Sequence, residues 1–334
     1  MRARRLFASP GPTLEIRDIE LPEPGPGQVL VRVTHSYVSA GSEMNFFRVN
    51  PPGSQAEPRP LGYMTVGRVE YVGDGVSGFK VGDRVLTAGL HGDIHLVDPH
   101  DQGHTDWYIE PLDDAVPDRT AGFVILGDVA LHGVRRAQLQ IDESVAVFGA
   151  GLIGQLTIQF ARMSGAYPVI AVDLFDRRLE QAQVSGATHV VNARQTNPVQ
   201  AIRDITGGAG AETLFHCTPT PSILQTLLSA AAERGVIVLS GSAPGTAEIG
   251  LQVELLRREL TIIANYEAGL TTPHPYWPWT RQRNRRACLR MLKSGDLKLD
   301  HLVSHVVPAE QAQAMFEMMG RGGDDWMGVV FTWE

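Results

Sequence analysis

Two kinds of hydrophobic pattern divide the chain. Before residue 119, alternating apolar and polar positions predict short strands at residues 28–33 and 66–72, and no long stretch has a helical period. Clusters of Pro and Gly, such as residues 22–27, separate these segments. We therefore expect the first third of the chain to be rich in β-structure.

Beyond residue 120, short apolar runs alternate with helical segments. After a helical stretch at 120–136, strands are expected at 145–148, 169–172, 189–191, 213–216, 236–240 and 260–264. Helices are expected at 152–163, 177–184, 221–233 and 281–293. Alternation of strands and helices at this spacing predicts an α/β fold with a parallel, doubly wound sheet.

Composition limits the kind of protein. The 334 residues are 43% hydrophobic and 20% charged, which is typical of a globular chain of about two domains. The net charge of −8 disfavours nucleic acid and anionic membranes as partners. With Cys217 and Cys288 as the only cysteines, a disulfide framework and a zinc site of several thiolates are excluded. No apolar run approaches the ~18–20 residues of a membrane span, so a cytoplasmic protein is expected.

The clearest motif is a glycine-rich turn. Gly149, Gly151 and Gly154 form a GxGxxG pattern that follows an expected strand and opens an expected helix. Asp173 ends the next strand, 19 residues after Gly154. This is the full context of a dinucleotide-binding fingerprint, in which the helix N-terminus faces the pyrophosphate.

The residue that ends the second strand also bears on which cofactor binds. The carboxylate of Asp173 can accept hydrogen bonds from a ribose 2′-hydroxyl and repels a 2′-phosphate, which favours NAD over NADP. Arg177 and Arg178 follow closely and could hold a 2′-phosphate, although a solvated helix face also explains them. The residues expected to contact NAD are Gly149, Gly151, Leu152, Ile153, Gly154, Asp173, Arg178, Cys217 and Ser240.

Three motifs together resemble the medium-chain dehydrogenase/reductase family. They are GYMTVGRVEYVGDGVSGFKVGDRV at 62–85, VALHGVRRA at 129–137 and the GAGLIG turn. The resemblance covers nearly the whole chain. It implies hydride transfer, a GroES-like β-rich catalytic domain at 1–125 completed by 269–334, and a Rossmann NAD-binding domain at 126–268.

The resemblance does not extend to the metal ligands. Zinc-containing members have a Cys in a CGSD-like motif and a His-Glu pair, where this chain has Ala40 in AGSE and Tyr63-Met64. A further ligand position falls near Ile125. We therefore expect a member of the zinc-free branch, with no metal.

One stretch leaves the metal question open. It contains His91, His95, His100 and His104 together with Asp93, Asp98, Asp101 and Asp106. Such a cluster can bind zinc or nickel, whereas a polar loop is the plainer interpretation.

The run of aromatic and basic residues at 276–295 resembles zinc-free glycoside 3-dehydrogenases such as D-guloside 3-dehydrogenase. This resemblance implies a zinc-independent dehydrogenase that oxidises a secondary hydroxyl of a sugar, glycoside or polyol to a ketone with NAD, or performs the reverse reduction. A zinc-free quinone or enoyl reductase and a non-catalytic NAD-binding protein are the alternatives.

Carbohydrates present hydroxyl groups and an apolar face, which polar and aromatic side chains recognise. The expected substrate contacts are Asn45, His104, Asp106, Trp107, Tyr276 and Trp277. Trp277 could instead anchor its loop on the next helix.

The oxidation also needs a group that removes the hydroxyl proton. Because Tyr63 stands at a ligand position of the zinc enzymes, we predict Tyr63 as general base, with Ser42 relaying the proton and Glu43 orienting the sugar. Glu43, Asp106 and His104 are the rival bases. A homodimer or homotetramer, formed through residues 260–264, is expected from the family.

Overall fold

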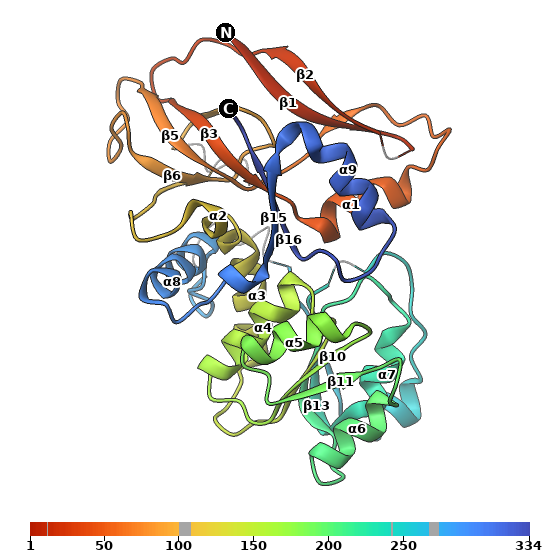
Figure 1. Ribbon diagram of the computed structural model, residues 1–334. Coiled ribbons are helices and arrows are strands. Elements are labelled where there is room, and N and C mark those ends of the chain that lie inside the picture. The colour runs from red at the N-terminus through yellow and green to blue at the C-terminus, as the bar shows by residue number, and fades with distance from the viewer. Residues whose placement is uncertain (12, 100–107, 242, 267–273) are drawn as a thin grey trace. The chain divides into compact units, whose positions relative to one another are not determined.

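The computed structural model describes residues 1–334 except 12, 100–107, 242 and 267–273. The chain divides into two compact units, Met1–Ile125 with Arg285–Glu334, and Leu126–Asn284 (Figure 1). The sequence placed the second boundary at residue 269, whereas the structure places it after Asn284. The segment before Asn284 belongs to the second unit because the rings of Trp277 and Trp279 pack on side chains of that unit.

The first unit is built on a mixed sheet in the order β15-β16-β3-β5-β6-β8, with β7 also paired to β3. The strands are β3 (Val29–Tyr37), β5 (Thr65–Val72), β6 (Arg84–Thr87), β7 (Ile94–Val97), β8 (Ile109–Pro111), β15 (Val303–Pro308) and β16 (Gly328–Thr332). A smaller sheet contains β1 (Arg2–Ser9), β2 (Thr13–Glu20) and β4 (Arg59–Pro60). Because β16 lies between β15 and β3, residues 328–332 complete the sheet that Val29–Tyr37 begins.

The first unit also contains short helices. They are α1 (Ala40–Val49), α2 (Asp118–Ala121), α9 (Ala312–Gly320) and the 3-10 turns η2 (Asp300–Leu302) and η3 (Ala309–Gln311). The sequence showed no helical period before residue 119, so α1 was missed. Distant contacts stabilise it, since Phe47 of α1 packs edge-on against Phe316 of α9 with ring centroids 5.7 Å apart.

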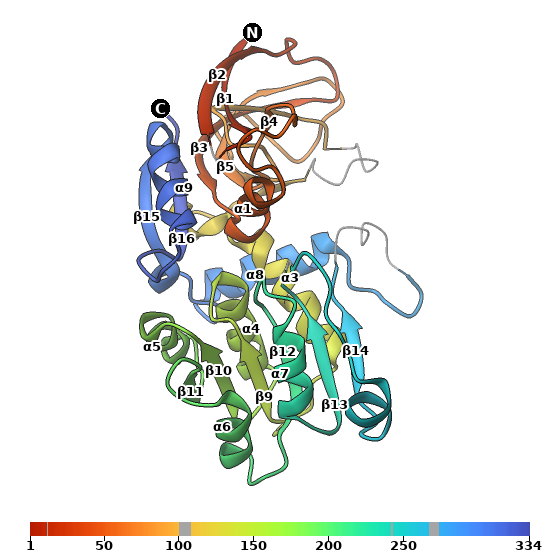
Figure 2. The ribbon, with the colours of Figure 1, turned by 90° about the vertical axis from the view of Figure 1, so that its right-hand side faces the viewer.

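The second unit is a six-stranded parallel sheet in the order β11-β10-β9-β12-β13-β14 (Figure 2). Its strands are β9 (Val145–Phe148), β10 (Val169–Asp173), β11 (His189–Asn192), β12 (Ala211–His216), β13 (Ala231–Leu239) and β14 (Thr261–Ala264). Its helices are α4 (Leu152–Met163), α5 (Asp176–Val184), α6 (Pro198–Ile205), α7 (Ile223–Ala230) and the π-helix η1 (Leu251–Leu256). Two helices cross the boundary between the units, α3 (Val124–Ala137) and α8 (Arg281–Ser294). The strand order reverses between β9 and β12, which confirms the predicted doubly wound α/β fold.

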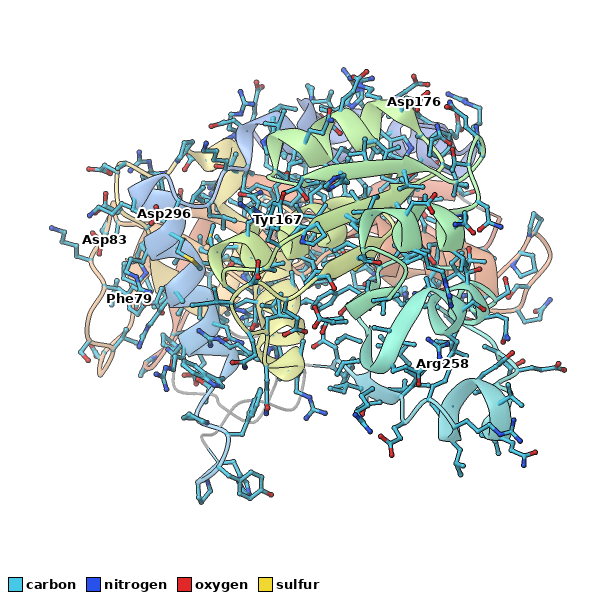
Figure 3. All side chains as sticks on the ribbon, turned by 90° about the horizontal axis from the view of Figure 1, so that it is seen from below. Phe79, Asp83, Tyr167, Asp176, Arg258 and Asp296 are labelled. Atoms are coloured by element: carbon cyan, nitrogen blue, oxygen red, sulfur yellow. The ribbon has the colours of Figure 1, made fainter. Side chains whose placement is uncertain are left out.

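One predicted helix is shorter than expected. The apolar run at 221–233 predicted a single helix, but α7 ends at Ala230 and β13 begins at Ala231. The guanidinium of Arg258, labelled in Figure 3, donates to the carbonyl groups of Leu228 and Ala231, so it satisfies acceptors that the helix end leaves free. None of the helices in the described part of the chain has the length and hydropathy needed to span a membrane.

Candidate functional site

The glycine-rich turn joins β9 to α4. Gly149 has a φ of +95°, which L-residues with side chains rarely adopt. A β-carbon on Gly154 would lie 1.8 Å from the carbonyl oxygen of Gly149, whereas one on Gly151 would meet no atom within 4 Å. The turn therefore needs glycine at its ends for its own shape and leaves open space at Gly151. Such a cradle at a helix N-terminus fits the pyrophosphate of a dinucleotide.

Asp173 ties the end of β10 to this turn. Its Oδ2 accepts a hydrogen bond of 2.7 Å from the Ala150 amide, and its Oδ1 accepts from the Leu174 and Phe175 amides at 2.7 and 3.1 Å. The carboxylate is thus held beside the glycine turn, where the fingerprint requires it. Arg178 extends its guanidinium over the Phe175 ring, 5.1 Å from the centroid.

Two other expected cofactor contacts follow neighbouring strands of the same sheet. Cys217 follows β12, and burial raises the pKa of its thiol to about 12, so the thiol is neutral. Ser240 follows β13, and its Oγ accepts a hydrogen bond of 3.1 Å from the side-chain Nδ2 of Asn265. The carboxyl ends of parallel strands lie at one edge of a sheet, so these residues share an edge with the glycine turn. Leu152 and Ile153 begin α4, and their contacts with a cofactor stay predictions.

In the first unit, the hydroxyl of Tyr63 donates a hydrogen bond to Ser39 Oγ. The backbone amide of Ser39 donates in turn to Glu43 Oε1 at 2.7 Å. The sequence named Ser42 as the relay partner of Tyr63, but the partner in the structure is Ser39, and Ser42 is exposed. Ser39 precedes α1 directly, so the start of that helix fixes the position of the Tyr63 hydroxyl.

A second chain of hydrogen bonds reaches Glu43 from the other side. His91 Nε2 lies 3.0 Å from Glu43 Oε2, and His91 Nδ1 lies 2.7 Å from Ser36 Oγ. The indole of Trp333 donates to Ser36 Oγ at 2.9 Å. Since an indole N–H can only donate, one consistent assignment of protons runs from Trp333 through Ser36 and a neutral His91 to the Glu43 carboxylate.

These contacts change the picture of Glu43. Its side chain is 3% exposed, and each of its oxygens accepts a hydrogen bond from within the chain. The role of Glu43 in orienting a sugar stays a prediction. The recorded contacts give it a structural role, because it joins His91 to the start of α1.

The positions where zinc-containing relatives carry ligands hold no ligand set in this chain. Met64 and Ile125 are buried apolar side chains, and Ala40 has no donor atom. A lone phenol at Tyr63 is a poor ligand for zinc, which prefers thiolate, imidazole and carboxylate. The residues at these positions therefore do not fit a catalytic zinc.

The histidine-rich stretch is only partly described. The Nδ1 of His95 lies 2.9 Å from Thr87 Oγ1, and burial, helped by the charge of Arg5, lowers the pKa of His95 to about 3. Asp93 accepts a hydrogen bond of 2.8 Å from the Arg4 amide. Among the described residues, no three His, Cys, Asp or Glu side chains come together as a metal site. His100, Asp101, His104 and Asp106 lie outside the described residues.

Some of the expected substrate contacts can be placed. The buried Oδ1 of Asn45, on α1, has no hydrogen-bond partner, so it could accept from a hydroxyl group. Tyr276 is 82% exposed, and its ring lies 3.8 Å from that of His274. Trp277 packs edge-on against His132 at 5.6 Å. The positions predicted at His104, Asp106 and Trp107 fall outside the described residues.

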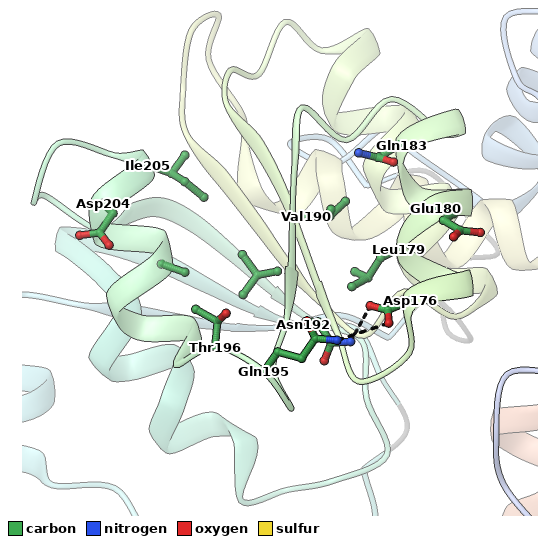
Figure 4. Close-up of a pocket in the computed structure, with 12 residues that line it drawn as sticks. Asp176, Leu179, Glu180, Gln183, Val190, Asn192, Gln195, Thr196, Asp204 and Ile205 are labelled. Atoms are coloured by element: carbon green, nitrogen blue, oxygen red, sulfur yellow. Dashed lines mark hydrogen bonds between the residues drawn. The ribbon is translucent and has the colours of Figure 1, made fainter.

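A cavity of about 610 Å³ lies elsewhere, between α5 and α6 beside the edge strand β11 (Figure 4). Among the described residues its lining includes the carboxylates of Asp176, Glu180 and Asp204 and no Lys or Arg. Three carboxylates disfavour a phosphate-bearing ligand. The glycine turn is therefore the better candidate for the cofactor.

The glycine cradle, the aspartate at the end of β10 and the β-rich unit define the class of two-domain, nucleotide-linked dehydrogenases. Residues 25–106 match the alcohol dehydrogenase GroES-like domain, and residues 153–279 match the zinc-binding dehydrogenase domain. Together with the relatives named below, these two matches support the medium-chain dehydrogenase/reductase family, whose members of this type use NAD(P).

Named relatives agree with this assignment. The chain is 28% identical over 340 residues to L-threonine 3-dehydrogenase of Pyrococcus horikoshii, covering 94% of each chain. It is 27% identical over 331 residues to sorbitol dehydrogenase of Bacillus subtilis, covering 91% of this chain and 90% of that one. Alcohol dehydrogenase TADH from Thermus sp. ATN1 superposes with a TM-score of 0.82 at 25% identity, covering 100% of both chains. The chain is therefore an oxidoreductase that acts on CH–OH groups.

Proposed function

We propose that the chain oxidises a secondary hydroxyl group of a sugar, glycoside or polyol to a ketone with NAD, or catalyses the reverse reduction, without a catalytic metal. The observation that carries this proposal is the hydrogen bond from the Tyr63 hydroxyl to Ser39. The family resemblance implies that Tyr63 stands where zinc-containing members have a ligand. The relative named sorbitol dehydrogenase supports a polyol as substrate. The run at 276–295 supports the glycoside 3-dehydrogenase subgroup.

The chemistry divides between the cofactor and the chain. A dinucleotide held at the glycine turn would supply the hydride acceptor for the carbon that carries the hydroxyl group. The hydroxyl proton must leave as well, and without a metal a side chain within hydrogen-bond reach must take it. Tyr63 takes this proton in its deprotonated form and then donates it to Ser39 Oγ, from which it passes to water, while Glu43 holds Ser39 through its backbone amide. The free Oδ1 of Asn45 accepts a hydrogen bond from another hydroxyl of the substrate.

The test of this function is a panel of polyols, sugars and glycosides, with NADH formation followed by absorbance. Turnover of at least one member supports the proposal. Reduction of quinones or enones by NADPH, with no polyol oxidised, would favour the reductase alternative. Tight NAD binding with no turnover on either panel would favour a non-catalytic protein.

The cofactor preference gives a first quantitative expectation. Because a 2′-phosphate would face the Asp173 carboxylate, NAD should be favoured by about 2–3 kcal/mol, or roughly 30–150-fold in kcat/KM. Asp173→Ser removes the negative charge of the carboxylate and should reduce the preference for NAD over NADP. Steady-state kinetics with both cofactors measures this. Equal efficiency with NADP would show that Arg177 or Arg178 holds the phosphate.

The metal content gives a second expectation. Because Ala40, Tyr63, Met64 and Ile125 offer no ligand set, the purified protein should carry no stoichiometric zinc, and chelators should leave its activity unchanged. Elemental analysis and an assay after dialysis against a chelator measure this. One zinc per chain, with activity lost on chelation, would contradict the proposal and direct attention to the histidine-rich stretch.

We also propose that the chain forms a homodimer through the outer edge of its parallel sheet. The edge strand β14 is preceded by η1, where Leu251, Val253 and Leu256 are 68%, 60% and 71% exposed. An apolar surface of this kind, beside a strand that ends its sheet among the described residues, favours pairing with a second copy. The mass in solution, measured by light scattering, tests this.

A further inference from the structure

His91 is a buried side chain of the first unit that has no role in the reaction proposed for Tyr63. It is fully buried, and its ring packs edge-on against Phe331 with ring centroids 5.4 Å apart. Its two ring nitrogens lie within hydrogen-bond distance of Glu43 and Ser36, at 3.0 and 2.7 Å. A buried imidazole with a partner at each nitrogen is held in one orientation, so the ring constrains the side chains that it contacts.

The main chain of His91 holds the segment that leads into Tyr63. The His91 amide donates a hydrogen bond of 2.8 Å to the carbonyl group of Leu61, two residues before Tyr63. Gly62, between them, has a φ of +96°. A β-carbon on Gly62 would lie 2.5 Å from the His91 amide nitrogen and 2.8 Å from two carbons of the His91 ring. The backbone just before Tyr63 is therefore packed directly against His91, in a conformation that favours glycine.

The side chain of His91 reaches the hydroxyl group of Tyr63 through two residues. His91 Nε2 lies 3.0 Å from Glu43 Oε2, and Glu43 Oε1 accepts from the Ser39 amide at 2.7 Å. The Glu43 amide donates to the Ser39 carbonyl group at 2.9 Å, so Glu43 binds both the amide and the carbonyl group of Ser39. Ser39 Oγ in turn accepts a hydrogen bond from the Tyr63 hydroxyl.

The start of α1 explains why the Ser39 hydroxyl is available to Tyr63. Ser39 is the N-cap residue of α1, and a serine at this position usually accepts a hydrogen bond from an amide of the first turn. Within the described part of the chain its hydroxyl makes no such capping bond and accepts from Tyr63 instead. Glu43, in the first turn, binds the N-cap amide as the glutamate of a capping box does. Glu43 therefore holds the start of the helix, and the serine hydroxyl binds the phenol.

From these contacts we infer that His91 is a positioning residue for Tyr63. It packs against the backbone before Tyr63, and through Glu43 it holds the residue that accepts from the Tyr63 hydroxyl. All of these residues belong to the first unit. The inference rests on the proposed function, in which Tyr63 takes the substrate proton. Because a reacting group misplaced by about 1 Å can lose about a hundredfold in rate, holding the phenol in place contributes to catalysis.

Two substitutions separate the polar contacts of His91. In His91→Gln the amide nitrogen can replace Nε2 and donate to Glu43, whereas the shorter amide of His91→Asn reaches Ser36 but not Glu43. We expect kcat to fall about 10–100-fold in His91→Asn and to stay within about threefold in His91→Gln, with the affinity for NAD unchanged in both. The matched control is His35→Asn, which alters a half-buried histidine of β3 whose Nδ1 lies 3.0 Å from Thr34 Oγ1. It should leave kcat unchanged. No loss in His91→Asn, or an equal loss in His91→Gln, would overturn the inference.

A double-mutant cycle distinguishes positioning of the phenol from a general effect on the fold. If His91 acts through the Tyr63 hydroxyl, His91→Asn should lower kcat by less than about threefold once Tyr63→Phe has removed that hydroxyl. If His91 only stabilises the unit, the two losses should multiply. Steady-state kinetics of the two single variants and the double variant measures this, and full multiplication of the losses would overturn the inference.

A measurement without turnover follows Tyr63 itself. The full-length protein is prepared with carbon-13 at Cζ of its tyrosines, and Tyr63→Phe identifies the Tyr63 signal among the seven tyrosines. Because the chemical shift of Cζ responds to the hydrogen bond of the phenol, the signal should shift in His91→Asn and keep its position in His91→Gln and His35→Asn. If His91→Asn does not fold, Ser36→Ala removes the partner of His91 Nδ1 and should shift the same signal. An unshifted signal in the folded variant would overturn the inference.

The positioning role and the proposed function fail in different ways. Loss of turnover in Tyr63→Phe, together with full activity and an unshifted Tyr63 signal in His91→Asn, would overturn the positioning role and leave the proposed function standing. No turnover of any polyol, sugar or glycoside, together with a Tyr63 signal that depends on His91, would refute the proposed function and keep the link between His91 and Tyr63.

Discussion

Replacing Tyr63 with phenylalanine is expected to lower kcat by ~10²–10⁴ while the affinity for NAD stays unchanged. The substitution removes the hydroxyl that donates to Ser39 and keeps the ring in place. Loss of a general base affects the transition state and not the binding of the cofactor. Steady-state kinetics on the best substrate of the panel, with NAD binding measured by fluorescence titration, gives both values.

Two serines serve as comparison for Tyr63. Ser39→Ala removes the hydrogen-bond partner of the phenol and should lower kcat less than Tyr63→Phe, because water can replace the lost hydroxyl. Ser42→Ala alters the residue that the sequence pointed to and should have a smaller effect than Ser39→Ala. A Tyr63→Phe enzyme with nearly full kcat would refute the proposed base, and Glu43→Gln, His104→Ala and Asp106→Asn would then be assayed in its place.

Two alanine substitutions in the glycine turn should distinguish an effect on folding from an effect on cofactor binding. In Gly154→Ala the new β-carbon meets the Gly149 carbonyl oxygen at 1.8 Å, so the backbone must move. We expect Tm to fall by roughly 5 °C or more, and NAD affinity to be largely lost. Differential scanning calorimetry and a titration with NAD measure the two effects.

Gly151→Ala is the matched substitution in the same turn. Its β-carbon meets no atom within 4 Å in the protein, so Tm should stay nearly the same. The methyl group would occupy the space through which the backbone approaches the pyrophosphate, so NAD affinity should fall about 10–100-fold. Unchanged NAD affinity in Gly151→Ala would show that the dinucleotide binds elsewhere.

The doubly wound unit could be predicted from the sequence because its signals are local. The strand at 145–148, the glycine turn and the helix at 152–163 follow one another within 19 residues, and the structure has β9 and α4 with the same bounds. Here a short apolar run, a glycine turn and a helical period follow one another, so each element can be recognised from its own residues. The end of helix α7 was not predicted, because a continuous apolar run contains no signal that marks where a helix ends and a buried strand begins.

The hydrogen-bond network around Glu43 could not be predicted for a different reason. Its members are far apart in the chain: 48 residues separate Glu43 from His91, 55 separate His91 from Ser36, and 297 separate Ser36 from Trp333. The residue types alone allowed a metal site for His91, a sugar contact for Glu43 and a relay role for Ser42. Only the packing of α1 against the sheet decides which neighbours each side chain meets.

The place of β16 in its sheet affects how the protein is made. Proteins are synthesised from the N-terminus, and domains generally fold as units as they emerge from the ribosome. The residues of Leu126–Asn284 are contiguous, so the nucleotide-binding unit can fold while later residues are still being added. The sheet of the first unit is complete only when Gly328–Thr332 has paired with β3 and Trp333 has formed its hydrogen bond with Ser36. A nascent chain therefore completes its nucleotide-binding unit before its β-rich unit, and a chain interrupted before Gly328 has the glycine turn in place but lacks the strand that completes the sheet beside Tyr37.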